Sequence, residues 1–114
     1  MRPQMGNNPA ADVPRWYAIH TNSKQEERAN SNLRAWGVET LNPLLKERTV
    51  NQYTGKPSYV VKALFPRYIF AQFVARDLLH KVCFTRGVYN VVSFGDHPSP
   101  VDDEIIDYIQ MRID

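Results

Sequence analysis

Apolar residues recur with two different periods along this chain, and the changes of period mark the expected elements. Five runs rich in β-branched and aromatic residues predict strands, and three segments with apolar residues every three or four positions predict helices. Their order is β-α-β-β-β-α-β-α. The expected strands are residues 15–21, 45–52, 58–63, 67–73 and 88–94; the expected helices are residues 23–36, 74–83 and a last one from about residue 102; residues 95–100 are expected to form a loop.

Short local signals set the ends of these elements. Ser23 and Glu26 match the S-x-x-E capping box, so the first helix is expected to begin there. Gly37 stands where a helix C-terminal glycine belongs, and Gly87 follows the second helix in the same way. Residues 53–57, YTGKP, have turn chemistry and predict the tip of a hairpin.

The stretch LFPRYIFAQF, residues 64–73, carries bulky side chains on both faces of one expected strand. Successive strand residues point to opposite faces, so Tyr68 and Phe70 share one face while Ile69 and Phe73 share the other. Two crossover helices cover one face of such a sheet. The other face needs the third helix or a partner.

The predicted order gives a recognisable topology once the hairpin of residues 45–63 is treated as an insertion. The remainder reads β-α-β-β-α-β, which is the ferredoxin-like arrangement. We therefore predict an α+β fold with an antiparallel sheet flanked by helices. Residues 1–14, rich in small residues, Asn and Pro, are expected to be a disordered arm, and residues 15–114 one domain.

Composition bears on the number of domains, the cellular compartment and the kind of partner. The 114 residues suit one domain, and 43% hydrophobic with 23% charged residues is ordinary for a soluble protein. No secretory or membrane-spanning segment is visible, and a single cysteine, Cys83, fits a reducing cytoplasm. The net charge is +2, but five acids and one base fall in residues 101–114, which leaves +6 for residues 1–100. Such a bias is compatible with a polyanionic partner.

Catalytic chemistry finds no support in the sequence. The histidines His20, His80 and His97 are scattered, and no metal-ligand, nucleophile or phosphate-loop motif is present. Cys83 falls on the expected buried face of its helix, where an inert thiol is far commoner than a nucleophile. We therefore expect neither an enzyme nor a metal or cofactor site.

Several short motifs, in this order, resemble the N-terminal domain of the NusG family. They are W-Y at residues 16–17, LFPRYIF at 64–70, R-G-V at 86–88 and S-F-G at 93–95. The resemblance covers about residues 15 to 114. It is closest to specialised paralogues of the RfaH type, which also carry L-F-P-x-Y-L-F and R-G-V…F-G.

This resemblance implies a bacterial transcription elongation and antitermination factor, monomeric and cytoplasmic, with no membrane partner. Such a domain docks a hydrophobic surface on the clamp helices of the RNA polymerase β′ subunit, reaches toward the β subunit and suppresses pausing. Paralogues of the RfaH type also contact the exposed non-template DNA strand. Relatives continue into a linker and a small C-terminal KOW barrel, which we expect this chain to lack.

The family's binding residues carry over by position. The polymerase-binding set is His20, Tyr68, Phe70 and Phe94. The DNA-binding set is Gln25, Arg28, Asn32 and Arg86, to which Lys24 is added as a neighbouring contact. His20 stands where relatives have an aromatic residue, and Asn22 and Ser23 replace basic residues of the RfaH type. Residues 78–80, Leu-Leu-His, stand in place of the H-T-T motif that contacts the β subunit, so that contact is expected to differ.

Spacing alone leaves alternatives open for these residues. Gln25, Arg28 and Asn32 lie at i, i+3 and i+7 and share one side of the first helix, which faces either nucleic acid or only solvent. The aromatic residues of the strands are equally compatible with plain core packing. Arg86, just before Gly87, has a second possible role in capping the last carbonyls of the preceding helix.

Two other classes of protein share the predicted topology. A free-standing nucleic-acid-binding module of the RRM type requires the basic and aromatic RNP pattern, which neither residues 67–73 nor residues 88–94 match. A small ferredoxin-fold enzyme or ligand sensor would instead show a well-formed pocket with convergent polar groups.

Overall fold

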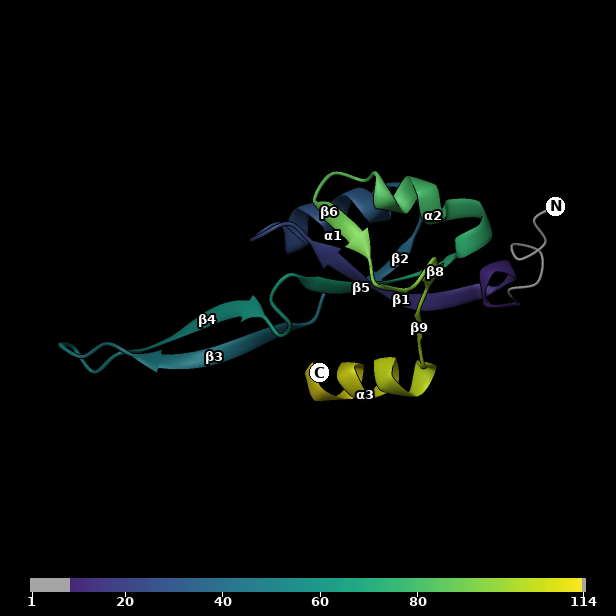
Figure 1. The fold of residues 1–114 in the computed structure, drawn as a ribbon. Coiled ribbons are helices and arrows are strands. Elements are labelled where there is room, and N and C mark those ends of the chain that lie inside the picture. Colours follow the sequence, from purple (N-terminus) through teal and green to yellow (C-terminus); the bar gives the residue numbers. More distant parts are fainter. Residues whose placement is uncertain (1–8, 114) are drawn as a thin grey trace.

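The computed structural model describes residues 9–113 of the chain (Figure 1). Of the N-terminal arm expected over residues 1–14, residues 1–8 lie outside the described residues. Residues 9–12 form a short 3₁₀ helix, η1, so structured residues begin before the boundary expected at residue 15. The elements are η1 (Pro9–Asp12), β1 (Pro14–Thr21), α1 (Glu26–Ala35), β2 (Glu39–Leu41), β3 (Leu44–Val50), β4 (Pro57–Ala63), β5 (Tyr68–Val74), α2 (Ala75–Cys83), β6 (Val88–Val91), β7 (Ser93–Phe94), β8 (His97–Pro98), β9 (Pro100–Val101) and α3 (Asp103–Ile113).

The main sheet has the strand order β2-β5-β1-β6, and every pairing in it is antiparallel. Strand β1 lies in the middle, with Ile19 opposite Ile69 of β5 and opposite Val91 of β6. The short strand β9 also pairs with β1. This order, with crossovers through α1 and α2, confirms the predicted ferredoxin-like arrangement.

The two faces of the sheet are covered by different helices (Figure 1). One face packs against α1 and α2, and its core includes the fully buried Tyr17, Ile69 and Leu33. The other face packs against α3, whose Ile106 and Ile109 form a second cluster with Trp16 and Phe70. The third helix therefore covers part of the second aromatic face of β5.

The start of α1 differs from the predicted capping box. The helix begins at Glu26, and its N-cap is Gln25, which makes no side-chain capping bond. The Glu26 carboxylate instead accepts a 2.7 Å hydrogen bond from the backbone N–H of Arg67. The Glu26 carboxylate thus binds the loop before β5, and the predicted capping box with Ser23 does not form.

The predicted end of α1 is confirmed, and the aromatic residue at this end is exposed. Gly37 has φ +82, and its N–H bonds to the carbonyl of Arg34, while Val38 bonds back to Leu33. Trp36 occupies the C-cap, where the chain leaves the helix, and its side chain is 51% exposed. Trp36 therefore leaves the apolar stripe of Ala29 and Leu33.

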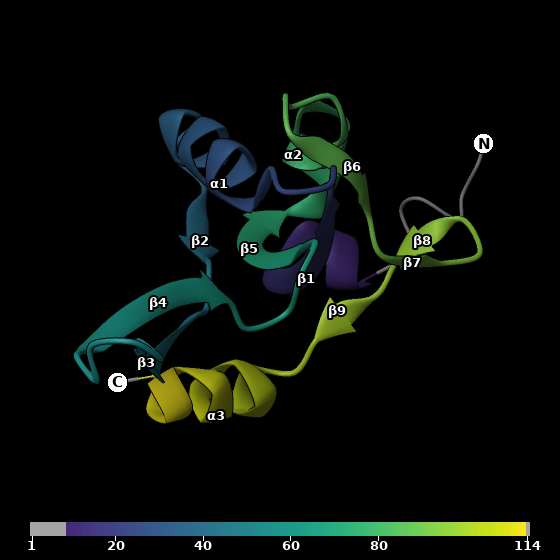
Figure 2. The same cartoon turned by 90° about the vertical axis from the view of Figure 1, so that its left-hand side faces the viewer.

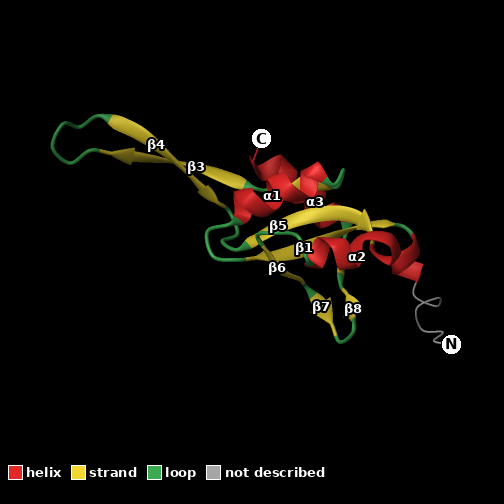
Figure 3. Ribbon diagram, turned by 90° about the horizontal axis from the view of Figure 1, so that it is seen from above, coloured by secondary structure: helices red, strands yellow, loops and turns green. Residues whose placement is uncertain are grey.

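The segment after α2 contains more strands than predicted. The expected strand over residues 88–94 divides into β6 and β7, and the expected loop over residues 95–100 contains β8, which pairs with β7. The chain then returns to β1 through β9, with Val101 opposite Trp16. Seen from above, the β7–β8 hairpin projects away from the main sheet (Figure 3).

Strands β3 and β4 form a separate two-stranded sheet that extends from the domain as an arm (Figures 1 and 2). The hairpin predicted over residues 45–63 is therefore confirmed. The described residues span 68 Å along their longest axis and only 28 and 25 Å across it. The arm accounts for that elongation.

Candidate functional site

Three aromatic rings gather at one end of the sheet, on the face that α3 partly covers. His20 of β1 lies directly opposite Tyr68 of β5, and their rings stack with centroids 4.9 Å apart. Tyr89 of β6 meets His20 edge-on at 5.0 Å. We call His20, Tyr68 and Tyr89 the ring cluster. Tyr68 is 37% and Tyr89 60% exposed, so the cluster presents aromatic surface to a partner.

Phe70 lies on the same face but beneath α3. It is 8% exposed and packs with Trp16, Ile106 and Ile109. Phe65, which is 38% exposed, meets the Phe70 ring edge-on at 6.0 Å. Phe70 is thus a core residue beneath this face of the sheet. The exposed ring that contacts it is that of Phe65.

Phe94 lies apart from the ring cluster, on the β7–β8 hairpin opposite His97. Its side chain is 85% exposed. The four residues expected to bind polymerase therefore divide by position. His20 and Tyr68 touch, Phe70 is core, and Phe94 stands on a separate hairpin.

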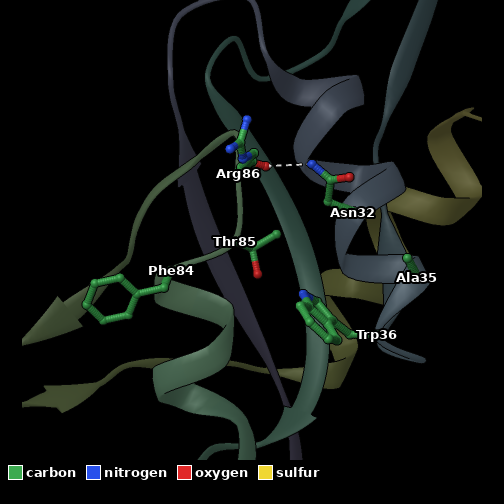
Figure 4. A pocket seen from close by; sticks show the side chains of 6 residues that line it. All are labelled: Asn32, Ala35, Trp36, Phe84, Thr85 and Arg86. Carbon is green, nitrogen blue, oxygen red and sulfur yellow. Dashed lines mark hydrogen bonds between the residues drawn. The ribbon is translucent and has the colours of Figure 1, made fainter.

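A second feature is an open pocket of about 400 Å³ between the ends of α1 and α2 (Figure 4). Asn32 and Arg86, both expected to bind DNA, meet at its rim. The Asn32 side-chain amide donates a 3.0 Å hydrogen bond to the backbone carbonyl of Arg86. The pocket is lined by Asn32, Ala35, Trp36, Phe84, Thr85 and Arg86.

A glycine allows the two walls of this pocket to approach. Gly87 has φ +95, and a Cβ at this position would lie 2.7 Å from the backbone nitrogen of Ala29 in α1. The backbone N–H of Asn22 also donates to the Gly87 carbonyl at 2.9 Å. The turn holding Arg86 is therefore seated directly against the start of α1.

The remaining residues of the expected DNA-binding set lie at the start of α1, whereas the pocket opens beside its last turn. Lys24 is in the preceding turn with φ +59, Gln25 is the N-cap, and Arg28 is exposed on the first turn. Within residues 9–113, no carboxylate pairs with Lys24, Arg28 or Arg86. Their charges are thus available to an anionic partner.

The last carbonyls of α2 have partners other than the Arg86 guanidinium. The Thr85 hydroxyl donates to the carbonyl of Lys81 at 2.8 Å, and the Thr85 backbone N–H bonds to Val82. The N–H of Phe84 bonds to the carbonyl of His80. Within residues 9–113, no hydrogen bond joins the Arg86 side chain to the carbonyls of His80, Lys81 or Val82, so the structure lends the capping alternative no support.

Two aromatic residues that were not among the predicted binding residues line the pocket. Trp36 and Phe84 are 51% and 77% exposed, and the ammonium of Lys81 lies 4.3 Å from the centre of the Trp36 ring. Trp36 stands immediately before Gly37, and a residue at a helix C-cap need not follow the helical stripe. That position is the signal that could have identified it.

Groups that could support catalysis or metal binding are not brought together in the described part of the chain. Residues 9–113 contain no cluster of three or more His, Cys, Asp or Glu side chains able to hold a metal ion. Cys83 is half-buried against the core, and Leu78 and Leu79 pack there as well. His80 is exposed and meets the Phe84 ring at 4.7 Å. No helix within residues 9–113 has both the length and the apolar character needed to cross a membrane.

Comparison with known proteins assigns the fold to a family. Residues 14–110 match the family described as transcription termination factor NusG. The transcription termination/antitermination protein NusG of Thermus thermophilus is 32% identical, over 82% of this chain and 59% of its own length. A structure titled "Domain interaction in Thermotoga maritima NusG" superimposes with a TM-score of 0.63 at 25% identity, over 90% of this chain and 58% of that one.

The chain spans about three fifths of the length of these relatives. The family match nevertheless covers nearly all of the described residues, including the ring cluster and the pocket. The chain therefore belongs to the NusG family, whose members are transcription factors rather than enzymes.

Proposed function

We propose that this chain is the polymerase-binding domain of a bacterial transcription elongation and antitermination factor that works in the cytoplasm. In this proposal it docks on the clamp helices of the RNA polymerase β′ subunit, holds the clamp closed and suppresses pausing. The non-template DNA strand is its second partner, as in paralogues of the RfaH type. The single observation that carries the proposal is the ring cluster, an aromatic surface left exposed beside α3.

The ring cluster has the properties of an interface anchor. Aromatic residues dominate the energetically important positions of protein interfaces because each buries a large, rigid surface. His20 and Tyr68 hold one another in a stack, and Tyr89 braces His20 from the side. The three rings lie outside the cluster that packs against α3, so we expect a docked helix pair to cover them.

The test is a titration of an isolated clamp-helix fragment of the cognate β′ subunit with the 114-residue chain. Tyr68→Ala should weaken binding about thirtyfold or more, because hot-spot aromatics contribute roughly 2 kcal/mol or more. Tyr53→Ala, at the 93% exposed tip of the arm, is the matched control and should keep the parent's affinity. If folded Tyr68→Ala binds as tightly as the parent, the ring cluster is not the docking surface.

The effect on transcription is measured separately, in a single-round elongation assay with the cognate polymerase. Saturating chain should shorten pause lifetimes, and Tyr68→Ala should need a correspondingly higher concentration to do so. Pause lifetimes that do not change at saturation would contradict the proposed suppression of pausing while leaving docking intact.

The contact with the non-template strand draws support from the pocket. Exposed Trp36 and Phe84 offer faces on which unpaired bases can stack, and Arg86 lines the same pocket. Arg28 lies in the first turn of α1, and neither arginine has a carboxylate partner in residues 9–113. Arg28→Ala and Arg86→Ala should each weaken binding to single-stranded DNA. Each should also flatten the dependence of log K on log salt by about 0.7, the value for one phosphate contact on a single strand.

Arg112→Ala, on α3, removes the same charge away from the pocket and is the control. Trp36→Leu tests stacking without changing charge, and should weaken binding with an unchanged salt slope. If Arg86→Ala and Arg112→Ala have the same affinity for single-stranded DNA and the same salt slope, the DNA contact is refuted and only the polymerase contact remains.

A further inference from the structure

The arm of β3 and β4 is a two-stranded sheet with neither face packed against the domain along its length. Among residues 44–63, only Thr49 and Ala63 are even half-buried, and Tyr53 at the tip is 93% exposed. Val50, Tyr59 and Val61 are each more than half exposed. A long exposed strand pair of this kind is an aggregation hazard unless it serves a partner.

The pairing register divides the arm into two faces of different chemistry. Arg48 lies opposite Tyr59, and Lys46 lies opposite Val61. Because side chains alternate along a strand, these four share one face, which we call the basic face. The opposite face, which we call the paired face, contains Leu45, Glu47, Thr49, Ser58, Val60 and Lys62.

The charges on the paired face are neutralised within it. Glu47 and Lys62 form an ion pair at 2.9 Å, and the hydroxyls of Thr49 and Ser58 share a hydrogen bond at 2.8 Å. Leu45, at the base of this face, lines a recess together with residues of α3. The paired face thus borders α3 only at its base, and its two charges balance each other.

In the described part of the chain, no acidic side chain forms an ion pair with the charges of the basic face. Lys46 lies 4.6 Å from the centre of the Tyr59 ring, and Arg48 makes no ion pair within residues 9–113. Lys56 adds a third cation next to the tip. The arm carries four basic residues and one acid, a net charge of +3 within a chain of net charge +2. The excess lies on the basic face and at the tip.

We propose that the basic face of the arm binds duplex DNA. The spacing of its cations suits a polyanion. Strand residues i and i+2, such as Lys46 and Arg48, are about 7 Å apart, and phosphates two steps apart on one DNA strand rise about the same, because each step rises about 3.4 Å. A two-stranded β-ribbon also fits the major groove of B-form DNA, which is about 12 Å wide. The major groove of A-form RNA is deep and too narrow for side chains to read. This surface is separate from the pocket and from the ring cluster.

The experiment measures binding of the 114-residue chain to a fluorescent DNA duplex as a function of salt. Lys46→Gln/Arg48→Gln should weaken binding roughly tenfold or more at low salt. The same double variant should flatten the slope of log K against log salt by about 1.8, because each of two phosphate interactions accounts for about 0.9. Arg15→Gln/Arg112→Gln removes the same charge from outside the arm and should keep nearly the parent's slope. Lys46→Arg/Arg48→Lys keeps both charges and should therefore keep the parent's slope.

Several results would overturn the proposal. One is a basic-face variant that binds the duplex as the parent does, and another is an equal loss of affinity in the Arg15→Gln/Arg112→Gln control. Equal affinity for duplex RNA of the same sequence would refute the assignment to DNA. A variant that loses polymerase affinity but no DNA affinity would make the arm a protein-binding element. Arg86→Ala is expected to bind duplex like the parent, so failure of the single-strand proposal and failure of this one are distinguishable.

Discussion

Strands β4 and β5 follow one another in the chain and are both rich in apolar residues, yet their side chains meet opposite environments. In β5, Ile69, Phe70 and Phe73 are each less than a tenth exposed. In β4, Tyr59 and Val61 are more than half exposed. The local sequence does not separate the two strands, because both suit a pleated surface.

The difference comes from what lies beside and above each strand. Strand β5 is hydrogen-bonded between β2 and β1, with α1 and α2 over one face and α3 over the other. Within residues 9–113, strand β4 pairs only with β3, and no helix covers the length of the hairpin. Burial is therefore decided by topology, and the same apolar residue has a different energetic role in the core and in the arm.

Two glycines with positive φ should show this difference most strongly. Gly87→Ala places a Cβ 2.7 Å from the Ala29 nitrogen, a backbone atom that cannot move aside easily. Backbone strain and overpacking together should lower the free energy of unfolding by about 3 kcal/mol or more. Gly55 lies at the tip of the arm with φ +71, and a Cβ added there has no atom within 4 Å. Gly55→Ala should therefore lower the free energy of unfolding by only about 1 kcal/mol, from backbone strain alone. Urea unfolding measures both, and equal costs would contradict the comparison.

Two valines on strands test burial with the same chemical change. Val91 of β6 is 3% exposed and Val61 of β4 is 58% exposed. Val91→Ala removes two buried methyl groups, so it should lower the free energy of unfolding by about 2 kcal/mol. Val61→Ala should change the free energy of unfolding by no more than about 0.5 kcal/mol, because its side chain is already exposed to solvent in the folded chain. A Val61→Ala variant as unstable as Val91→Ala would show that the arm is packed in solution.

Much of the compact part could be predicted from the sequence because its periodicity reflects burial. The helical recurrence around Ala29 and Leu33 and the two-faced strand at Ile69 and Phe70 come from residues that are buried in the structure. Family membership also favours the predicted transcription factor over an RRM-type module or a small enzyme.

Other features depend on partners distant in sequence and left no local signal. Glu26 leaves its expected cap for the N–H of Arg67, 41 residues away. The pocket joins Asn32 to Arg86 across 54 residues, and only the family resemblance placed both at one surface. Tyr89 joined the ring cluster because β6 pairs beside β1, which no periodicity predicts.

The smallest effect at neutral pH concerns the one tyrosine that the core encloses completely. Tyr17 is fully buried and packs against Phe73, with ring centroids 4.8 Å apart. Burial raises the pKa of the Tyr17 phenol above its ordinary value of 10.0, although nearby Arg15 opposes the shift. The folded chain therefore holds this proton more tightly than the unfolded chain does.

A raised pKa gives a definite sign to the pH dependence. The stabilising contribution is fully present below pH 10, where Tyr17 is protonated in both states, and is lost as the pH rises through the folded-state value. The free energy of unfolding from urea titrations should thus fall more steeply above pH 10 in the parent than in Tyr17→Phe, which keeps the ring but cannot ionise. Any neutral-pH cost of Tyr17→Phe is measured first and subtracted. If the free energy of unfolding falls with the same slope above pH 10 in both proteins, the Tyr17 phenol reaches solvent. This part of the core would then be as accessible to water as the arm is.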